Sequence, residues 1–360
     1  MKNTFKIIFT IIAALIGAGF ASGKEIYSFF FIYGIHGILG IFISSFLISL
    51  TACQVLKLCY KLHINSYIEF YTYIIKHIFP KKDNNSIAKI TNFIIVLVNS
   101  FLLITFYIMI AGFSSFLNQE FNMNKIIGSI LIIFFCYLAF QKNISSLVKI
   151  SNYIIPVFII FILFCSFQNL NFIDNYNNIS LYIKQDNYVL PIIKAVLYGC
   201  YNCVLLIPLL ITLTNYINNL KIIYSASIIN FVIIALLSIC VFNILLLGNS
   251  KIFSLDMPLI EIIKKYGNII SIIYLILIGS SIYTTAISTG CAFLNGCTLK
   301  NIKRNSILIC SSAIVLSQIS FSVLVELLYP ILGILGFIEI IGIFGVIIFE
   351  KILGKIWGHP

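Results

Sequence analysis

Long apolar stretches dominate this chain, and each has the length of a membrane-spanning helix. About 20 apolar residues cross the hydrocarbon core of a bilayer, where only helices and closed barrels satisfy their own backbone polar groups. Of the 360 residues, 61% are hydrophobic and 9% are charged, so too few polar residues remain to form a separate soluble domain. The sequence therefore predicts an all-α polytopic membrane protein, a single membrane domain over 1–360, with about ten spans near 6–32, 37–59, 90–117, 126–141, 148–168, 189–213, 222–247, 269–294, 305–325 and 329–349.

Two further segments mix apolar, aromatic and basic residues and are too short to span the membrane. Residues 64–79 suit a helix that lies in the cytoplasmic interface and ends before Pro80. Residues 257–266 suit a similar helix on the outer side. Both are typical of amphipathic helices at a membrane surface.

The basic residues predict the orientation of the chain. With the N-terminus inside, the inner loops carry sixteen of the 23 Lys and Arg residues and the outer loops carry five, while Lys24 and Lys194 lie within spans. Because cytoplasmic loops carry the excess of basic residues, both termini are expected to be cytoplasmic in a multi-pass protein of the cell membrane. The net charge of +12 is spread over loops rather than gathered on one face, so no nucleic-acid partner is expected.

The N-terminus also has a second interpretation, that of a cleavable signal peptide. Lys2 and Lys6 precede an apolar run, and small residues at 19–21 could provide a cleavage site. However, apolar character resumes directly after Glu25, and cleavage would leave an odd number of spans. The sequence therefore favours an uncleaved first span, which an intact mass would test.

Two spans contain polar, glycine-rich interruptions. Residues 17–23 (GAGFASG) are followed at once by Lys24 and Glu25 in the first span, and Tyr198 to Cys203 (YGCYNC) lies in the middle of the sixth, between Pro191 and Pro208. Irregular backbone and charges are tolerated at membrane depth only where protein or a water-filled cavity surrounds them. Both spans are therefore predicted to be broken. Five spans on either side give two repeats of opposite orientation, 1–168 and 189–350, as in many secondary transporters.

The first interruption also resembles that of a known group. Residues 17–25 (GAGFASGKE), followed by Phe29, Phe30 and a turn with Gly34 and Gly37, resemble the YkvI-type membrane proteins. That group is a distant branch of the amino acid, polyamine and organocation transporter superfamily. The resemblance implies a LeuT-like fold, a 5+5 inverted repeat with broken helices 1 and 6, more firmly than it implies a substrate.

A broken helix leaves amides and carbonyls without partners at the same depth. A small zwitterion fits these two poles, with its carboxylate on amides near 20–23 and its ammonium on carbonyls of 16–19 and near Gly199. The alternative is that the glycines only permit close helix packing. The candidate substrate-binding residues are Gly17, Ala18, Gly19, Phe20, Ala21, Ser22, Gly23, Asn99, Tyr107, Tyr198, Gly199, Tyr201 and Asn202.

Three charged residues, Lys24, Glu25 and Glu339, are candidates for gating or ion coupling. Lys24 and Glu339 both lie about 15 Å below the outer surface at about 1.5 Å per residue, so they could pair. In some LeuT-like proteins an ion pair between the first and tenth spans forms an outer gate, and the resemblance implies that role here. Glu25 then remains as a proton carrier or a ligand for a substrate amine. The alternative is that Lys24 and Glu25 satisfy each other or lie in the outer vestibule.

Hydroxyl side chains recur every four residues along the eighth span. In sodium-coupled LeuT-like proteins such hydroxyls join carbonyls of the first span around Na⁺, and the resemblance implies Ser281, Thr284 and Thr285 with the carbonyls of Ala13 and Ile16. Oxygen ligands suit a hard cation, but Ser and Thr also bond back to their own helix. The coupling ion is therefore expected to be Na⁺ or H⁺, and no other cofactor is expected.

No enzyme motif accompanies these features. Phosphate loops, nucleophile elbows and metalloprotease helices are absent from the sequence, so the chain is not expected to be an enzyme. The sequence favours an ion-coupled secondary transporter of amino acids or related small amines, which works by alternating access around a midplane site. The alternatives are a transporter-like sensor without net transport, or a membrane-embedded enzyme or channel. The expected partners are a small-molecule substrate and the lipid bilayer; the sequence specifies no protein partner.

Overall fold

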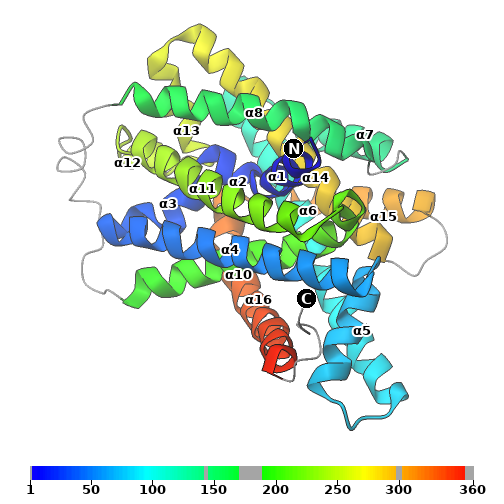
Figure 1. The fold of residues 1–360 in the computed structure, drawn as a ribbon. Coiled ribbons are helices and arrows are strands. Elements are labelled where there is room, and N and C mark those ends of the chain that lie inside the picture. The colour runs from blue at the N-terminus through cyan, green and yellow to red at the C-terminus, as the bar shows by residue number, and fades with distance from the viewer. Residues whose placement is uncertain (1, 142–144, 170–188, 297–301, 353–360) are drawn as a thin grey trace.

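All regular structure in the described part of the chain is helical. The computed structural model describes residues 2–141, 145–169, 189–296 and 302–352 (Figure 1). The helices are α1 (Lys2–Leu15), α2 (Ala18–Ser22), α3 (Lys24–Phe29), α4 (Ile35–Leu62), α5 (Tyr67–Ile78), α6 (Asn84–Phe121), α7 (Lys125–Phe140), α8 (Ser145–Phe167), α10 (Val189–Leu213), α11 (Leu220–Leu245), α12 (Ser250–Phe253), α13 (Pro258–Ile263), α14 (Asn268–Gly296), α15 (Ile302–Leu316) and α16 (Phe321–Ile352), with short 3₁₀ turns η1 (Phe31–Tyr33), η3 (Thr214–Tyr216) and η4 (Lys264–Tyr266).

The number of apolar helices agrees with the expected spans. Among the described residues, six helices are long and apolar enough to cross a membrane, namely α4, α6, α10 with η3, α11, α14 and α16. Shorter apolar helices lie in α1, α7, α8 and α15, at the remaining predicted positions. The all-α fold with about ten spans is therefore confirmed.

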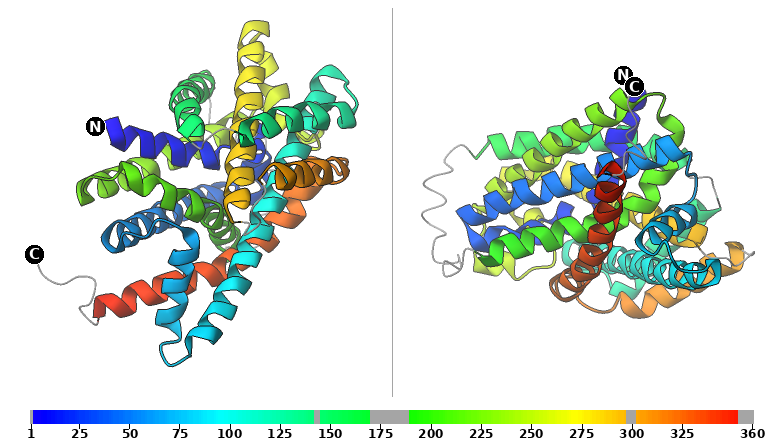
Figure 2. Two further views of the ribbon diagram at one scale, coloured as in Figure 1. Left: turned by 90° about the vertical axis from the view of Figure 1, so that its right-hand side faces the viewer. Right: turned by 60° about the horizontal axis from the view of Figure 1, so that its bottom comes forward.

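The spans pack in two groups that cross each other. Helix α10 packs against α4 and α16, and α11 packs against α4, while α14 packs against α6 and α15 against α7. Figure 1 shows α4, α8 and α11 running in nearly one direction, and α16 crossing them steeply. Figure 2 shows the long α6 and α16 inclined to the others from a second side. The broken helix α1 to α3 lies between the groups, because α1 contacts α8 and α11 while α2 contacts α14.

The bundle has two ends that the short helices identify. The end with α12, α13 and Gly34 is called the α13 end, and the opposite end, with α5 and the start of α6, the α5 end. Helix α5 has a buried face of Phe70, Tyr71 and Ile74, as its amphipathic sequence predicts. Helix α13 is different from its predicted surface position, because Leu259, Ile260 and Ile263 are all fully buried in the protein.

The first span is broken where its sequence predicts. Helix α1 ends at Leu15, Gly17 is extended at the N-cap of α2, and Gly23 ends α2 with φ of 79°. That left-handed conformation favours glycine, because other residues place Cβ close to the following carbonyl. The chain thus passes the middle of the bundle as three short helices, and the predicted interruption at 17–23 is confirmed.

The sixth span is not broken, contrary to the prediction. Helix α10 continues from Val189 to Leu213 through Gly199. A glycine costs a helix only about 1 kcal/mol relative to alanine, so packing can hold the helix together. The side chain of Leu47 fills the space where a Gly199 Cβ would lie. The Asn202 amide bonds back to the Tyr198 carbonyl in its own helix, at 2.9 Å.

The boundary between the last two spans also differs from the prediction. Helix α15 ends at Leu316 and α16 begins at Phe321, so Pro330, close to the predicted start of the tenth span, lies inside α16. The start of α16 is fixed from a distant loop, because Asp256 accepts hydrogen bonds from Ser322 N (2.9 Å) and Ser322 Oγ (2.6 Å). This cap joins residues 66 positions apart, so no local sequence signal reveals it.

Candidate functional site

The break in the first span leaves polar backbone groups facing α6 and α14. First-turn amides of a helix lack intrahelical acceptors, and the Ala18 amide points at the sulfur of Met109 on α6, at 3.3 Å. The Ala21 carbonyl accepts a hydrogen bond from the Tyr274 hydroxyl of α14. A thioether sulfur is a weak acceptor, so the Ala18 amide is available to a stronger one.

A cluster of oxygens lies on the α1 side of this break. Thr285 Oγ1 of α14 is 3.1 Å from the Ala13 carbonyl and 3.2 Å from the Ile16 carbonyl. One turn away the Ser281 hydroxyl is fully buried without a hydrogen-bond partner. Thr284, by contrast, bonds back to the Ser281 carbonyl at 2.9 Å. The structure thus brings Thr285 to the carbonyls of Ala13 and Ile16, whereas Ser281 and Thr284 lie nearby on the same helix without a hydrogen bond to α1.

A buried carboxylate lies on the other side of the break. Glu25, near the start of α3, is 2% exposed, and the hydroxyls of Tyr201, Tyr198 and Tyr329 lie against it. Glu25 Oε2 and the Tyr201 hydroxyl have no hydrogen bond of normal geometry. The side chain of Glu25 also occupies the space where a Cβ of Gly19 would lie. These residues form what is called below the tyrosine cage: Glu25, Tyr198, Tyr201 and Tyr329.

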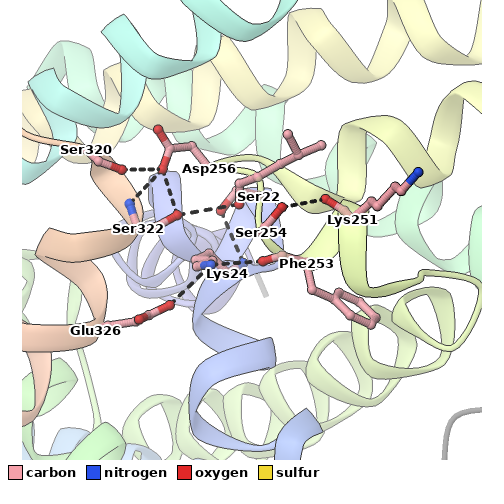
Figure 3. Close-up of polar contacts among 10 residues, drawn as sticks. Ser22, Lys24, Lys251, Phe253, Ser254, Asp256, Ser320, Ser322 and Glu326 are labelled. Carbon is pink, nitrogen blue, oxygen red and sulfur yellow. Dashed lines mark hydrogen bonds and ion pairs between the residues drawn. The ribbon is translucent and has the colours of Figure 1, made fainter. Parts of the chain in front are cut away.

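Lys24 closes the α13 end of the site, but its partner is not the predicted one. Its ammonium is 3.2 Å from Glu326 Oε1 of α16 and donates to the Phe253 carbonyl at 3.1 Å (Figure 3). The predicted pair of Lys24 with Glu339 is therefore wrong. Because α16 begins eight residues before the predicted tenth span, Glu326 lies near its α13 end and Glu339 is about 20 Å further along the helix.

Glu339 has a different partner at the α5 end. It accepts a hydrogen bond from the Tyr71 hydroxyl of α5. Beside it, the Tyr67 hydroxyl donates to Asn99 Oδ1 at 2.9 Å, and the Asn99 amide donates to the Gly296 carbonyl at the end of α14, at 3.2 Å. These contacts hold α5 against α16, α6 and α14.

The loop before α13 completes the α13 end. Figure 3 shows Asp256 facing Ser320 and Ser322 at the start of α16, beside Ser22 and Lys24. Partial burial alone would raise the pKa of the Asp256 carboxyl, but hydrogen bonds from Ser322 and Ser320 outweigh it and hold the pKa below its ordinary value. Asp256 is thus a charged cap that ties the loop to α16.

The predicted substrate-binding residues divide into two sets. Residues 17–23, Tyr198 and Tyr201 lie at the break or in the tyrosine cage. Asn99 is instead held near the end of α14, and the Tyr107 hydroxyl contacts Ser312 of α15 at 2.6 Å. Gly199 packs against Leu47, and the Asn202 amide donates to a carbonyl of its own helix α10. Sequence reasoning missed Met109, Tyr274, Tyr329 and Glu326, since only the fold brings them to the break.

A cavity of about 360 Å³ lies at the α5 end. It is lined by the start of α5, the end of α10 and the end of α14, including Asn65, Thr212, Ser288 and Asn295. Ser288 is three residues from Thr285, which is about 4.5 Å along a helix. The cavity therefore reaches to within one turn of the oxygen cluster, while Lys24 and Glu326 close the opposite end.

The arrangement of helices is similar to that of a protein of known structure. The structure is similar to the crystal structure of MhsT in complex with L-phenylalanine, with a TM-score of 0.60 and 14% sequence identity over 88% of this chain and 80% of that chain. The fold is therefore LeuT-like, as the resemblance in the first span implies. No protein-family model matches the chain.

A relative in sequence covers almost the whole chain. The chain is 22% identical over 335 residues to the uncharacterized membrane protein YkvI of Bacillus subtilis (strain 168), which is 91% of both proteins. This similarity confirms the resemblance to YkvI-type proteins. Together with the apolar helices it shows a multi-pass membrane protein.

Proposed function

We propose that the protein is an ion-coupled secondary transporter of amino acids or related small amines, which works by alternating access around the broken first span. The proposal is supported mainly by the position of the break, which lies between a cluster of oxygens that suits a metal cation and a carboxylate that suits an ammonium group. On one side lie the oxygens of Ala13, Ile16, Ser281 and Thr285, and on the other lies the carboxylate of Glu25. A packing role for the glycines explains neither group.

The oxygen cluster suits a small hard cation. Thr285 Oγ1 already lies close to two carbonyls, and the buried Ser281 hydroxyl has unused capacity. A Na⁺ ion takes several oxygen ligands, and a buried polar atom without a partner is unfavourable unless something binds it. Na⁺ at this position would join α1 to α14 and so couple ion binding to the arrangement of the first span.

The substrate class follows from the second group and from the fold. The Ala18 amide offers a donor to a carboxylate, and Glu25 offers an acceptor to an ammonium. MhsT, which shares the fold, is described in complex with L-phenylalanine. An amino acid or a related amine therefore fits the site better than a sugar or an anion.

Uptake into proteoliposomes tests the proposal. The purified protein should accumulate labelled compounds from a mixture of amino acids and amines, driven by a Na⁺ or a proton gradient. Binding without accumulation under every gradient would contradict transport and favour a sensor. Release of a chemically altered product would favour an enzyme instead.

A matched pair of variants tests the oxygen cluster. Thr285→Val keeps the shape of the side chain but removes the bridging hydroxyl, so stimulation of uptake by Na⁺ should fall at least about tenfold, as for loss of a charge-assisted contact worth about 1.5 kcal/mol. Thr289→Val is the control, because the Thr289 hydroxyl bonds only to carbonyls of its own helix at 3.0 and 3.2 Å. Equal effects of the two variants would contradict Na⁺ binding at this position.

A further inference from the structure

The tyrosine cage holds an acidic group that nothing in the described chain neutralises. Glu25 is 2% exposed, and Tyr198, Tyr201 and Tyr329 are each exposed by 2% or less. Glu25 Oε2 and the Tyr201 hydroxyl are both buried without a hydrogen bond of normal geometry. The three hydroxyls lie against the carboxylate and can donate to it, but none of them supplies the positive charge that a buried carboxylate lacks here.

The basic residues close in sequence or space are engaged elsewhere. Lys24 pairs with Glu326 and the Phe253 carbonyl, with its ammonium 5.5 Å from the centre of the Tyr27 ring. Lys194 of α10 lies 5.8 Å from the centre of the Phe29 ring. None of the described basic residues forms an ion pair with Glu25.

The groups that face Glu25 from the neighbouring helices are aromatic or uncharged. From α10 come Tyr198 and Tyr201, whose rings are 5.4 Å apart and perpendicular, and from α16 comes Tyr329, 4.6 Å from Tyr201. From α2 comes the backbone of Gly19. Aromatic rings attract cations by their faces, and hydroxyls beside a carboxylate add acceptors. The rings and the carboxylate together therefore suit an ammonium group.

An ionised carboxylate in such surroundings needs a positive partner. Burying a lone charge is far less favourable than burying the neutral acid, so an empty site takes up a proton. A loaded site can instead be neutralised by the charge of the ligand. Because the site has one carboxylate, it can hold either the proton or the ammonium group, but not both.

We propose that the tyrosine cage binds the ammonium group of the substrate, and that each ammonium bound at Glu25 displaces one proton. The proposal rests on the proposed transport function and gives it a coupling rule. In the exchange the O–H bond of the Glu25 acid breaks, the proton leaves to solvent, and the carboxylate forms a hydrogen-bonded ion pair with the ammonium. Charge is conserved at the site, so substrate moving one way is exchanged for a proton moving the other way.

Proton release on binding tests this exchange directly. Purified protein in weakly buffered detergent solution with a pH-sensitive dye receives either a mixture of L-amino acids or the corresponding amines without the carboxylate. We expect one proton released for each ligand bound, and an affinity that rises by up to about tenfold per unit of pH while a proton is being displaced. Release with the amines shows that the ammonium alone is sufficient, and release with amino acids only shows that the carboxylate also binds. No release from either mixture would overturn the proposal.

Three variants locate the proton. Glu25→Gln should weaken binding at least about tenfold and abolish proton release, as expected for loss of a charged hydrogen-bond partner. Glu339→Gln is the matched control within the membrane, because Glu339 is engaged with Tyr71 of α5. Glu261→Gln is the surface control, because Glu261 pairs with Lys264 at 2.7 Å. Proton release that is lost in Glu339→Gln but kept in Glu25→Gln would contradict the assignment.

A second, more conservative variant in the cage keeps the test valid if Glu25→Gln does not fold. Tyr201→Phe keeps the ring and removes the unpaired hydroxyl, so it should weaken binding a few-fold while the stoichiometry of one proton remains. Unchanged binding and unchanged pH dependence in both Glu25→Gln and Tyr201→Phe would refute the proposal. If proteoliposomes accumulate substrate but binding releases no proton, the exchange fails while transport stands. If binding releases a proton but no substrate accumulates, transport fails while the exchange stands.

Discussion

Single residues decide which groups at the break are satisfied and which remain available to a ligand. Thr285 bridges two carbonyls of the first span, whereas Ser281, one turn away, is buried without a partner. Lys24 and Glu25 are neighbours in sequence, yet Lys24 reaches Glu326 and Glu25 enters the tyrosine cage. The difference follows from the direction of the two side chains on the short helix α3, which begins only after the turn at Gly23.

Asp256 is the residue whose charge is expected to affect stability. Its pKa is held below the ordinary value, so ionisation favours the folded state at pH above the unfolded pKa of about 3.9. That contribution is lost as the pH falls through the lower pKa of the folded state. Asp256→Asn should therefore lower stability at neutral pH by about 0.5–2 kcal/mol, the usual effect of losing a helix cap.

Thermal unfolding of the detergent-solubilised protein checks this expectation. The wild type and Asp256→Asn should differ at neutral pH, and the difference should shrink in acid, where the carboxyl of the wild type is protonated. A difference of the same size at both pH values would show that the charge of Asp256 does not stabilise the start of α16.

At the level of elements, close packing holds α10 against α16. A Cβ added to Gly333 or to Gly336 would lie only 2.6 Å from the carbonyl oxygen of Leu197 or of Cys200. These are backbone atoms and cannot turn aside, so the two glycines let the helices approach. This approach places Tyr329 of α16 beside Tyr201 of α10, and thereby builds the tyrosine cage.

Substitution of one glycine tests this packing. Gly336→Ala should force α10 and α16 apart and reduce stability by about 1–3 kcal/mol, in the range of overpacked cores. Gly345→Ala in the same helix is the control, because no atom lies within 4 Å of the added Cβ. We expect a lower unfolding temperature for the first variant only. Equal unfolding temperatures would show that the helices tolerate the added methyl group.

The sequence predicts some of these elements and not others, for physical reasons. The break at 17–23 is visible because Gly23 needs a left-handed conformation and two charges follow it. Gly199 gives a similar local signal, but packing against Leu47 keeps α10 continuous. The start of α16 depends on Asp256, 66 residues before Ser322, so local sequence predicts the tenth span too late and Glu339 instead of Glu326 as the partner of Lys24. The local sequence pattern identifies the helices, whereas the contact partners of the residues at the site depend on the tertiary structure.

For the whole molecule, the two ends of the bundle differ, and in the proposed alternating-access mechanism this arrangement is one of two states. Lys24, Glu326 and the Phe253 carbonyl close the α13 end, while the cavity lies at the α5 end. In the proposed mechanism the opposite state breaks the pair of Lys24 with Glu326 and closes the cavity. Cys291, which lines the cavity, reports on this exchange.

Loss of the ion pair should shift the balance between the two states. The Glu326 side chain is 53% exposed, so the pair is expected to contribute at most about 1 kcal/mol, or roughly a fivefold change in the ratio of states. In a variant that retains Cys291 alone, Glu326→Gln should therefore slow labelling of that cysteine by a thiol reagent. Glu261→Gln should leave the rate unchanged. Faster labelling in Glu326→Gln would contradict the proposed closure.

We propose that the break in the first span binds an amino acid or amine together with its coupling ion. An experimental structure of the protein with Na⁺ and the amine or amino acid that proteoliposomes accumulate tests it most directly. We expect density for the solute between Ala18 and the tyrosine cage, with its ammonium at Glu25, and density for the ion between Ile16 and Thr285. An uninterrupted first helix, or a solute bound away from residues 17–25, would contradict it.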